Sequence, residues 1–183
     1  MPKPRVKVLT SRTVYKGPLF SVRTDYVREP GRPSSGPGSR RDVIAHHGSV
    51  VLLPVLRGGD ILLVRQYRHA VGQYLWELVA GHIDRGEAPL AAARRELLEE
   101  TGYTARRLRK LLDVFPTPGF LSEHMVVYSC HGLTAGDARP EDDENIEVRR
   151  FTRAQLERMM RTGALRDAKS IASLLFYWRF VAR

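Results

Sequence analysis

One short segment, residues 81–103, constrains the fold of this chain more than any other. It reads GHIDRGEAPLAAARRELLEETGY and joins a loop that opens with glycine to a run of good helix formers. Pro89 suits the first turn of a helix, where its missing N–H costs nothing, and Gly102 suits the position just after the last turn. The segment therefore predicts a helix over residues 89–101 that is entered through a tight loop.

Three glutamates, Glu96, Glu99 and Glu100, would share one face of this helix. At 100° per residue they fall within a sector about 100° wide, and like charges that lie so close repel one another. The neighbouring Arg94 and Arg95 could relieve that repulsion in a solvated acidic patch. The alternative is a metal site, because oxygen ligands that converge on one face suit hard cations such as Mg²⁺ or Mn²⁺.

The loop before the helix favours the metal site. Gly81 and Gly86 bracket this loop, so that it can turn tightly and a backbone carbonyl near Ala80 can face the helix. Glu87 stands at the helix entry, where a carboxylate can cap the helix or bind Arg95. Together these residues predict a cation site built from one helix face and one loop.

The spacing of these residues resembles the complete Nudix box, GX5EX7REUXEEXGU. The matching residues are Gly81, Glu87, Arg95, Glu96, Leu97, Glu99, Glu100 and Gly102, followed by Tyr103 where the family usually has an aliphatic residue. The resemblance implies an α/β fold, the Nudix-type α/β/α sandwich with a mixed sheet. It also implies a divalent cation, Mg²⁺ or in its place Mn²⁺, and hydrolysis of a nucleoside diphosphate linked to another moiety.

The resemblance further implies a role for each residue of the box. Glu96 and Glu100 would be the main metal ligands, and the carbonyl of Ala80 would be a backbone ligand. Glu99 would be a further ligand or would support catalysis. The structural residues of the box would be Gly81, Glu87, Arg95 and Gly102.

Residues outside the box resemble the ADP-ribose pyrophosphatase branch of the family. Pro118 follows Gly102 by 16 residues, RQYR ends at residue 68, and WELVAG leads into the box. The resemblance implies substrate contacts from four residues: Arg68, Glu77, Pro118 and Glu123. For Arg68 a phosphate contact and a plain strand charge both stay open. For Glu123 the alternatives are a contact with a ribose hydroxyl or metal, and a solvated carboxylate.

An acidic loop, EDDEN at residues 141–145, is a natural source of the general base. A carboxylate on a mobile loop can reach the attacking water only when substrate is present. Glu144 is the first choice for the base and Asp142 the second. The alternative for this loop is a solvated acidic turn.

Strands are expected on both sides of the box, in a mixed arrangement rather than in regular βαβ units. Apolar and polar positions alternate over residues 5–47 and predict an N-terminal antiparallel β subdomain over residues 1–47, with a hairpin loop at 29–41. Residues 48–183 would form the Nudix hydrolase domain. Within it, SVVLLPVL and DILLVRQYR are expected to pair as a hairpin around RGGD. Two helices are expected after residue 150, the first capped by Thr152 and ended by Gly163.

The charge of the chain invites a nucleic-acid interpretation. The net charge is +10, and the first 45 residues hold ten Lys or Arg against three carboxylates. No basic stripe interleaved with aromatic residues accompanies this charge, so a nucleic-acid partner is not expected, whereas a small diphosphate suits a basic surface.

The sequence also bears on the compartment. Cys130 is the only cysteine, which excludes an intrachain disulfide and favours a reducing cytoplasm. The longest apolar run, residues 50–56, is too short to cross a bilayer, and residues 1–12 lack the apolar region of a secretory signal. A cytoplasmic protein without a membrane partner is therefore expected.

The sequence supports the hypothesis of a Nudix pyrophosphohydrolase that cleaves ADP-ribose, a nucleotide sugar, to AMP and ribose 5-phosphate. GDP-mannose, or another nucleotide sugar or dinucleotide, is the nearest alternative substrate. A catalytically silent Nudix-fold binding module is the alternative from another class, and the intact box argues against it. The resemblance implies a homodimer formed through the N-terminal strands, in which each subunit completes the site of the other.

Overall fold

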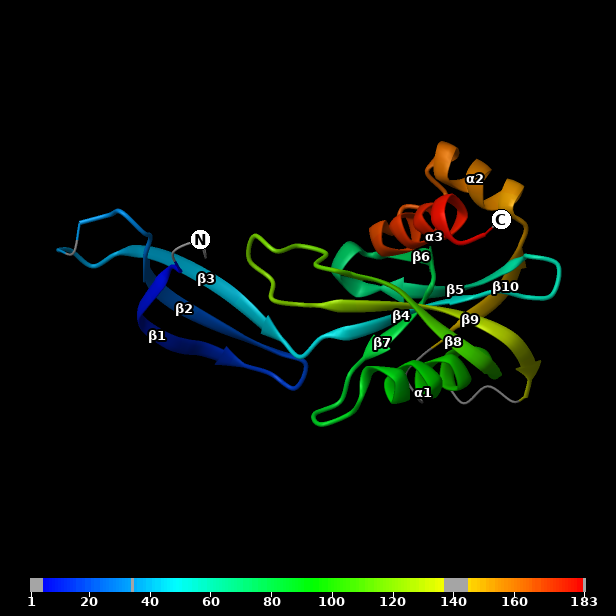
Figure 1. Ribbon diagram of the computed structural model, residues 1–183, viewed down its shortest axis with the longest axis horizontal. Coiled ribbons are helices and arrows are strands. Elements are labelled where there is room, and N and C mark those ends of the chain that lie inside the picture. Colours follow the sequence, from blue (N-terminus) through cyan, green and yellow to red (C-terminus); the bar gives the residue numbers. More distant parts are fainter. Residues whose placement is uncertain (1–4, 34, 137–144, 183) are drawn as a thin grey trace. The chain divides into compact units, whose positions relative to one another are not determined.

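The computed structural model describes residues 5–33, 35–136 and 145–182 (Figure 1). The backbone divides into two compact units. The smaller unit comprises Met1–Gly48 and Phe115–His124, and the larger unit comprises Ser49–Val114 and Met125–Arg183. The loop that carries Pro118 and Glu123 therefore belongs to the same unit as the N-terminal strands, although it lies far along the sequence.

The smaller unit is built on an antiparallel sheet in the order β1-β2-β3, as the alternating N-terminal sequence predicts. Its strands are β1 (Lys7–Lys16), β2 (Phe20–Arg28) and β3 (Ser39–His46). Two backbone hydrogen bonds attach the loop 115–124 to β3, from Ile44 N to Phe120 O (2.8 Å) and from Ser122 N to Ile44 O (2.9 Å). The smaller unit therefore includes a loop that is distant in sequence from its three strands.

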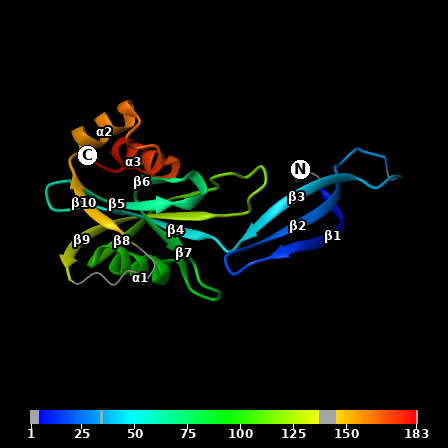
Figure 2. The same ribbon diagram turned by 180° about the vertical axis from the view of Figure 1, so that it is seen from behind.

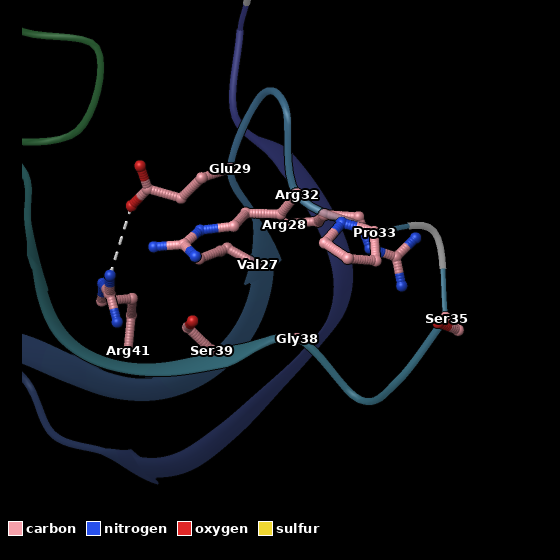
Figure 3. Close-up of a pocket in the computed structure, with 9 residues that line it drawn as sticks. All are labelled: Val27, Arg28, Glu29, Arg32, Pro33, Ser35, Gly38, Ser39 and Arg41. Carbon is pink, nitrogen blue, oxygen red and sulfur yellow. Dashed lines mark hydrogen bonds and ion pairs between the residues drawn. The ribbon is translucent and has the colours of Figure 1, made fainter.

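The Pro-, Gly- and Ser-rich segment forms the hairpin loop between β2 and β3, as its composition predicts. It surrounds a cavity of about 410 Å³, which Figure 3 shows with its arginine side chains. Arg28 Nη2 donates to the carbonyl of Gly36 (3.0 Å), and Arg41 pairs with Glu29 at 3.3 Å. Gly38 has φ of 81°, and a Cβ there would lie 2.7 Å from a carbonyl oxygen of β2. Two of the arginines around this cavity are therefore engaged by the loop itself.

The described part of the larger unit contains two sheets. One is mixed, in the order β7-β4-β9-β8, and its strands are β4 (Ser49–Pro54), β7 (Val79–His82), β8 (Tyr103–Val114) and β9 (Met125–Ala135). In it β4 runs parallel to β9 and antiparallel to β7, while β8 and β9 are antiparallel. The other is antiparallel, in the order β10-β5-β6, and its strands are β5 (Ile61–Arg68), β6 (Gln73–Glu77) and β10 (Glu147–Phe151).

RGGD forms the expected turn between two strands, with a hydrogen bond from Leu56 N to Asp60 O (2.9 Å), but the extended hairpin pairing is wrong. β4 and β5 belong to different sheets, and within the described residues the pairing next to the turn is one isolated bridge between Val55, which follows β4, and Ile61. All six residues of β4 are buried, so both faces of this strand need cover. A place between β7 and β9 in the mixed sheet provides that cover, whereas a hairpin at a sheet edge would not.

The described part of the larger unit has three α-helices: α1 (Pro89–Thr101), α2 (Arg153–Thr162) and α3 (Ala168–Phe180). α1 has the predicted bounds, because Pro89 starts it and Gly102, with φ of 72°, ends it. Thr152 and Gln155 form a capping box at the start of α2, and Gly163 follows its end as predicted. No helix among the described residues is long and apolar enough to span a membrane.

The sheets and helices of the larger unit form an α/β/α sandwich, which confirms the fold class (Figures 1 and 2). α1 covers one side, and α2 and α3 cover the other. Alternate residues of β4 pack to opposite sides: Val50 and Leu52 join the core cluster under α1, and Val51 and Leu53 join the cluster under α2 and α3. Because β7 pairs with β4, this packing places β7 against α1.

Candidate active site

The candidate site lies where α1 packs against β7. Gly81 on β7 faces the carboxylate of Glu96, and a Cβ at position 81 would lie 1.9–2.2 Å from the carboxylate atoms. Any side chain here would displace Glu96, so close approach rather than backbone conformation requires the glycine. The first glycine of the box motif therefore provides the space that Glu96 occupies.

The three glutamates of α1 line one small cavity. Glu96 and Glu100 are 9% and 5% exposed, and the Glu99 side chain is 35% exposed. The cavity has a volume of about 120 Å³, and its lining residues are Gln66, Arg68, Ala80, Gly81, His82, Glu96, Glu99 and Glu100. Positive charge close by stabilises nearly buried carboxylates in their ionised form, so this cavity favours cationic partners.

Gln66 and His82 also line the cavity, although neither was predicted for the site. Side chains two positions apart on a strand point to the same face of the sheet. Gln66 lies two residues before Arg68 on β5, and His82 lies two residues after Ala80 on β7. Strand alternation could therefore have indicated Gln66 once Arg68 had been chosen. Ala80 was chosen for its carbonyl, so alternation gave no such signal for His82.

Arg95 supplies part of the positive charge. Its Nη1 donates to Glu96 (2.7 Å) and Glu99 (3.1 Å), and its Nη2 donates to the carbonyl of His82 (3.0 Å). Nε and Nη2 also form a two-point pair with Glu87, at 3.1 and 2.9 Å. The hydrogen bonds from Arg95 lower the pKa of Glu87, and the same bonds, together with those to Glu96, raise the pKa of the guanidinium. Arg95 thus joins the loop before α1 to the acidic helix face.

The donor set of the cavity fits a divalent cation. Glu96, Glu99, Glu100 and the carbonyl of Ala80 supply only oxygen atoms, which Mg²⁺ and Mn²⁺ prefer. Across the described ranges, no three acidic, histidine or cysteine side chains already form a metal cage. Glu96 and Glu99 instead share Arg95. A cation in this cavity would therefore compete with Arg95 for the same carboxylate oxygens.

Arg68 reaches the cavity from β5 and is held by a buried carboxylate. Its Nε and Nη2 donate to the two oxygens of Glu77 at 2.8 and 2.9 Å. The Glu77 side chain is 2% exposed and that of Arg68 is 37% exposed. Burial by itself would raise the pKa of Glu77, but Arg68 and Lys169 outweigh it and lower this pKa. Glu77 therefore faces Arg68 and Lys169 rather than solvent, and its role in substrate binding stays a prediction.

Lys169 completes this network from the first turn of α3. Its Nζ lies 2.5 Å from Glu77 Oε2 and 3.0 Å from Asp167 Oδ1. Asp167 caps α3 by accepting a hydrogen bond from Ser170 N (3.0 Å), and Ser170 Oγ accepts one from Leu78 N (2.7 Å). The contact between Lys169 and Glu77 spans 92 residues of sequence, and no local motif signals it. The start of α3 is thereby fixed to the strand that precedes the site.

The remaining predicted residues fall into two groups. Glu144 and Asp142, the candidates for the general base, lie outside the described residues. Pro118 and Glu123 lie in the loop 115–124 of the smaller unit. Their roles in substrate binding stay predictions.

Comparisons with known proteins agree with the motif. The model of the NUDIX domain matches residues 45–174. The chain is 32% identical over 175 residues to the ADP-ribose pyrophosphatase of Bacillus subtilis (strain 168), covering 93% of this chain and 94% of the relative. It is 35% identical over 173 residues to the ADP-ribose pyrophosphatase of Mycobacterium tuberculosis, covering 92% of this chain and 81% of the relative.

Two further likenesses bear on substrate and fold. The chain is 34% identical over 152 residues to the GDP-mannose pyrophosphatase of Citrobacter koseri, covering 73% of this chain and 78% of the relative. A solved structure, described as an ADP compounds hydrolase, superimposes with a TM-score of 0.81 at 22% identity. It covers 97% of this chain and 95% of its own, so the whole described architecture has a counterpart among solved structures.

Proposed function

This chain belongs to the Nudix family and is a Nudix pyrophosphohydrolase, and from that premise we propose that it hydrolyses ADP-ribose. Water would cleave the bridge between the two phosphates, which gives AMP and ribose 5-phosphate. The observation that carries this assignment is one cavity in which three glutamates of α1 lie with Arg68 of β5. A diphosphate is stabilised both by a cation and by a fixed guanidinium, and this cavity is suited to provide the two together.

Four groups would hold the cation, which we take to be Mg²⁺ with Mn²⁺ as a substitute: Glu96, Glu99, Glu100 and the carbonyl of Ala80. When bound, such a cation neutralises charge on phosphate oxygens and makes water a better nucleophile. Gly81 keeps the space for Glu96 open, and Arg95 holds Glu96 and Glu99 on one face of α1. These contacts keep the carboxylates on one face of α1 until a bound cation would replace Arg95 beside them.

Arg68 is the residue that would contact a phosphate directly. Glu77 uses its Nε and Nη2, so Nη1 and the second hydrogen of Nη2 remain for another acceptor. The two-point pair fixes the plane of the guanidinium, which reduces the side-chain entropy lost on binding. The fixed guanidinium supports a role for Arg68 as a preorganised phosphate ligand over that of a plain strand charge.

The general base in this proposal is Glu144, with Asp142 as the second choice. Glu99, the most exposed glutamate of the box, would support catalysis beside the cation. Pro118 and Glu123 would contact the substrate from the loop 115–124, Glu123 through a ribose hydroxyl. Each of these roles comes from the family resemblance and is open to substitution experiments.

GDP-mannose is the second candidate substrate, because the relative from Citrobacter koseri is a GDP-mannose pyrophosphatase. We place ADP-ribose first, since the relatives from Bacillus subtilis and Mycobacterium tuberculosis, which are 32% and 35% identical over more than nine-tenths of this chain, are ADP-ribose pyrophosphatases. A silent binding module is disfavoured, because every glutamate of the box is present and the three on α1 line one cavity.

We also propose a cytoplasmic homodimer formed through the N-terminal sheet. This sheet leaves five large apolar side chains more than a third exposed: Val8, Val14, Tyr15, Phe20 and Tyr26. A three-stranded sheet needs a covered apolar face to be stable, and a second copy of the chain would provide one. Sedimentation should show a dimer, and a fully active monomer would contradict this assignment.

A panel of substrates tests the proposed reaction: ADP-ribose, GDP-mannose, NADH, diadenosine polyphosphates and an oxidised nucleotide. Each is assayed with Mg²⁺ and with EDTA, and added phosphatase converts the released monophosphates to inorganic phosphate. ADP-ribose should have the highest kcat/KM, and EDTA should abolish its turnover. A higher kcat/KM for GDP-mannose would reassign the substrate. No turnover of any compound, with ligand binding unchanged in Glu100→Gln, would identify a silent module.

A further inference from the structure

A second polar cavity lies in the larger unit, on the side of the mixed sheet that α3 covers. It has a volume of about 420 Å³, and its lining residues are Arg107, Leu108, Arg109, His131, Tyr177 and Val181. They come from β8, β9 and the last turn of α3 together with the residue that follows it. None of them lines the cavity of the glutamates, so the two cavities are distinct.

Strand register explains why the polar residues meet. β8 and β9 are antiparallel, and Arg107 lies opposite His131 while Arg109 lies opposite Ser129. Residues directly opposite, and residues two apart on a strand, share one face of a sheet. Two guanidinium groups, an imidazole and a hydroxyl are therefore brought together on this face. His131 Nε2 lies 3.1 Å from Ser129 Oγ, which orients the ring.

The positive charge of this cavity is not compensated within the described part of the chain. Arg107 and Arg109 form no ion pair with any described carboxylate, whereas the nearby Lys110 pairs with Asp113 at 2.7 Å. Burial and, next, the two arginines lower the pKa of His131, so its ring is neutral near pH 7. The carbonyl end of α3 contributes only about half a negative charge, which is less than two guanidinium groups supply.

Tyr177 adds a polar group to the same wall. It is 8% exposed, and its ring centroid lies 6.2 Å from that of His131. Its hydroxyl makes no hydrogen bond to any residue that the structure describes. The hydroxyl is not among the fully buried polar atoms, so it can donate to a molecule in the cavity.

We propose that this cavity binds a phosphate monoester, such as the phosphate group of a sugar phosphate, at a site separate from that of the diphosphate. Guanidinium groups form paired, charge-assisted hydrogen bonds with phosphate oxygens, and the imidazole and the phenol supply further donors. The volume lies in the range of small-molecule sites. This proposal holds whichever diphosphate the enzyme cleaves, because the second cavity shares no lining residue with the cavity of the glutamates.

Calorimetric titration with ribose 5-phosphate in EDTA tests the site without metal-dependent binding. Wild type should bind the sugar phosphate but not ribose, and Arg107→Ala or Arg109→Ala should each weaken binding by about tenfold. Arg106→Ala is the matched control, because Arg106 is on the same edge strand but does not line the cavity. It should change the affinity by less than about twofold, and so should Arg68→Ala in the other cavity. Thermal melting checks that each variant is folded.

A spectroscopic readout reports on the cavity itself. The charged groups that face His131 among the described residues are Arg107 and Arg109, and its neutral neighbours are Ser129 and Tyr177. A bound dianion should raise the pKa of His131, which NMR titration would measure with and without sulfate, whose charge is constant near neutral pH.

Four results would overturn the proposal: no binding to wild type, an equal loss in Arg106→Ala, a loss confined to Arg68→Ala, or an unchanged pKa of His131. After any of these results, Arg107 and Arg109 would be interpreted as charged side chains that prevent the edge strand β8 from pairing with another chain.

Discussion

Replacing Glu77 with glutamine tests the buried network behind Arg68. Glu77 is 1% exposed and accepts two hydrogen bonds from Arg68 and one from Lys169. Glu77→Gln keeps the shape of the side chain but removes the charge, so both cations lose their buried counterion. Breaking a buried ion pair by removing one partner costs about 3–5 kcal/mol. Arg68 is 37% exposed and Lys169 keeps Asp167 at 3.0 Å, so we expect the lower end, about 3 kcal/mol.

Urea unfolding followed by tryptophan fluorescence measures this loss. The two tryptophans of the chain, Trp76 on β6 and Trp178 on α3, both lie on elements that the network joins. With a slope of about 2 kcal/mol per molar urea, the midpoint should fall by about 1.5 M. Glu147→Gln is the matched control, because Glu147 is 40% exposed and pairs with Arg65 at 3.5 Å. Its unfolding free energy should change by less than about 1 kcal/mol.

The pH dependence of the same variant provides a second check. The pKa of Glu77 is lower in the folded protein than its ordinary value of 4.5, so its contribution to stability is fully present above about 4.5. The contribution is lost as the pH falls through the folded pKa. Wild type should therefore approach Glu77→Gln in stability as the pH decreases below the ordinary pKa of 4.5 and through the lower pKa of the folded protein. A loss of less than about 1 kcal/mol at neutral pH would refute the reasoning that Glu77 is a buried counterion.

Three further predictions concern single residues. Gly81→Ala should lower Mg²⁺-dependent kcat/KM by at least about tenfold, because its Cβ would meet the Glu96 carboxylate at about 2 Å; steady-state kinetics across Mg²⁺ concentrations would measure this. Arg95→Met should reduce the free energy of unfolding by about 1–3 kcal/mol, since Glu87, Glu96 and Glu99 lose the guanidinium that they share. In thermal melts, added Mg²⁺ should stabilise this variant more than it stabilises wild type. Equal Mg²⁺ shifts in both proteins would contradict the competition between Arg95 and the cation. Burial raises the pKa of Cys130 to about 12, so its thiol should react with a disulfide reagent at pH 8 only after unfolding in urea.

Features that depend on local chemistry could be predicted from the sequence. The bounds of α1 follow from Pro89 and Gly102, because one residue fits the first turn and the other permits the left-handed conformation after the last. The clustering of the three glutamates on one face follows from helical periodicity alone. The cap of α2 likewise follows from Thr152.

Features that depend on contacts distant in sequence could not be predicted. The apolar run of β4 fits a hairpin strand as well as a central strand, and only the cover on both faces decides between them. Lys169 meets Glu77 across 92 residues, and neither residue signals the other. Backbone hydrogen bonds attach the loop 115–124 to β3. Such bonds can form with almost any residue type, so the sequence does not predict this attachment.

Quantitative ³¹P NMR of ADP-ribose turnover tests the central claim, that the glutamates of α1 catalyse cleavage of a diphosphate bridge. With Mg²⁺, wild type should give equal amounts of AMP and ribose 5-phosphate. Glu100→Gln should lower kcat/KM by at least about a hundredfold without unfolding, because Glu100 is a proposed ligand of the cation. Glu157→Gln on α2, whose carboxylate pairs with Arg153 away from the cavity, should leave the rate unchanged. Full activity in Glu100→Gln, or products other than these two monophosphates, would contradict the account.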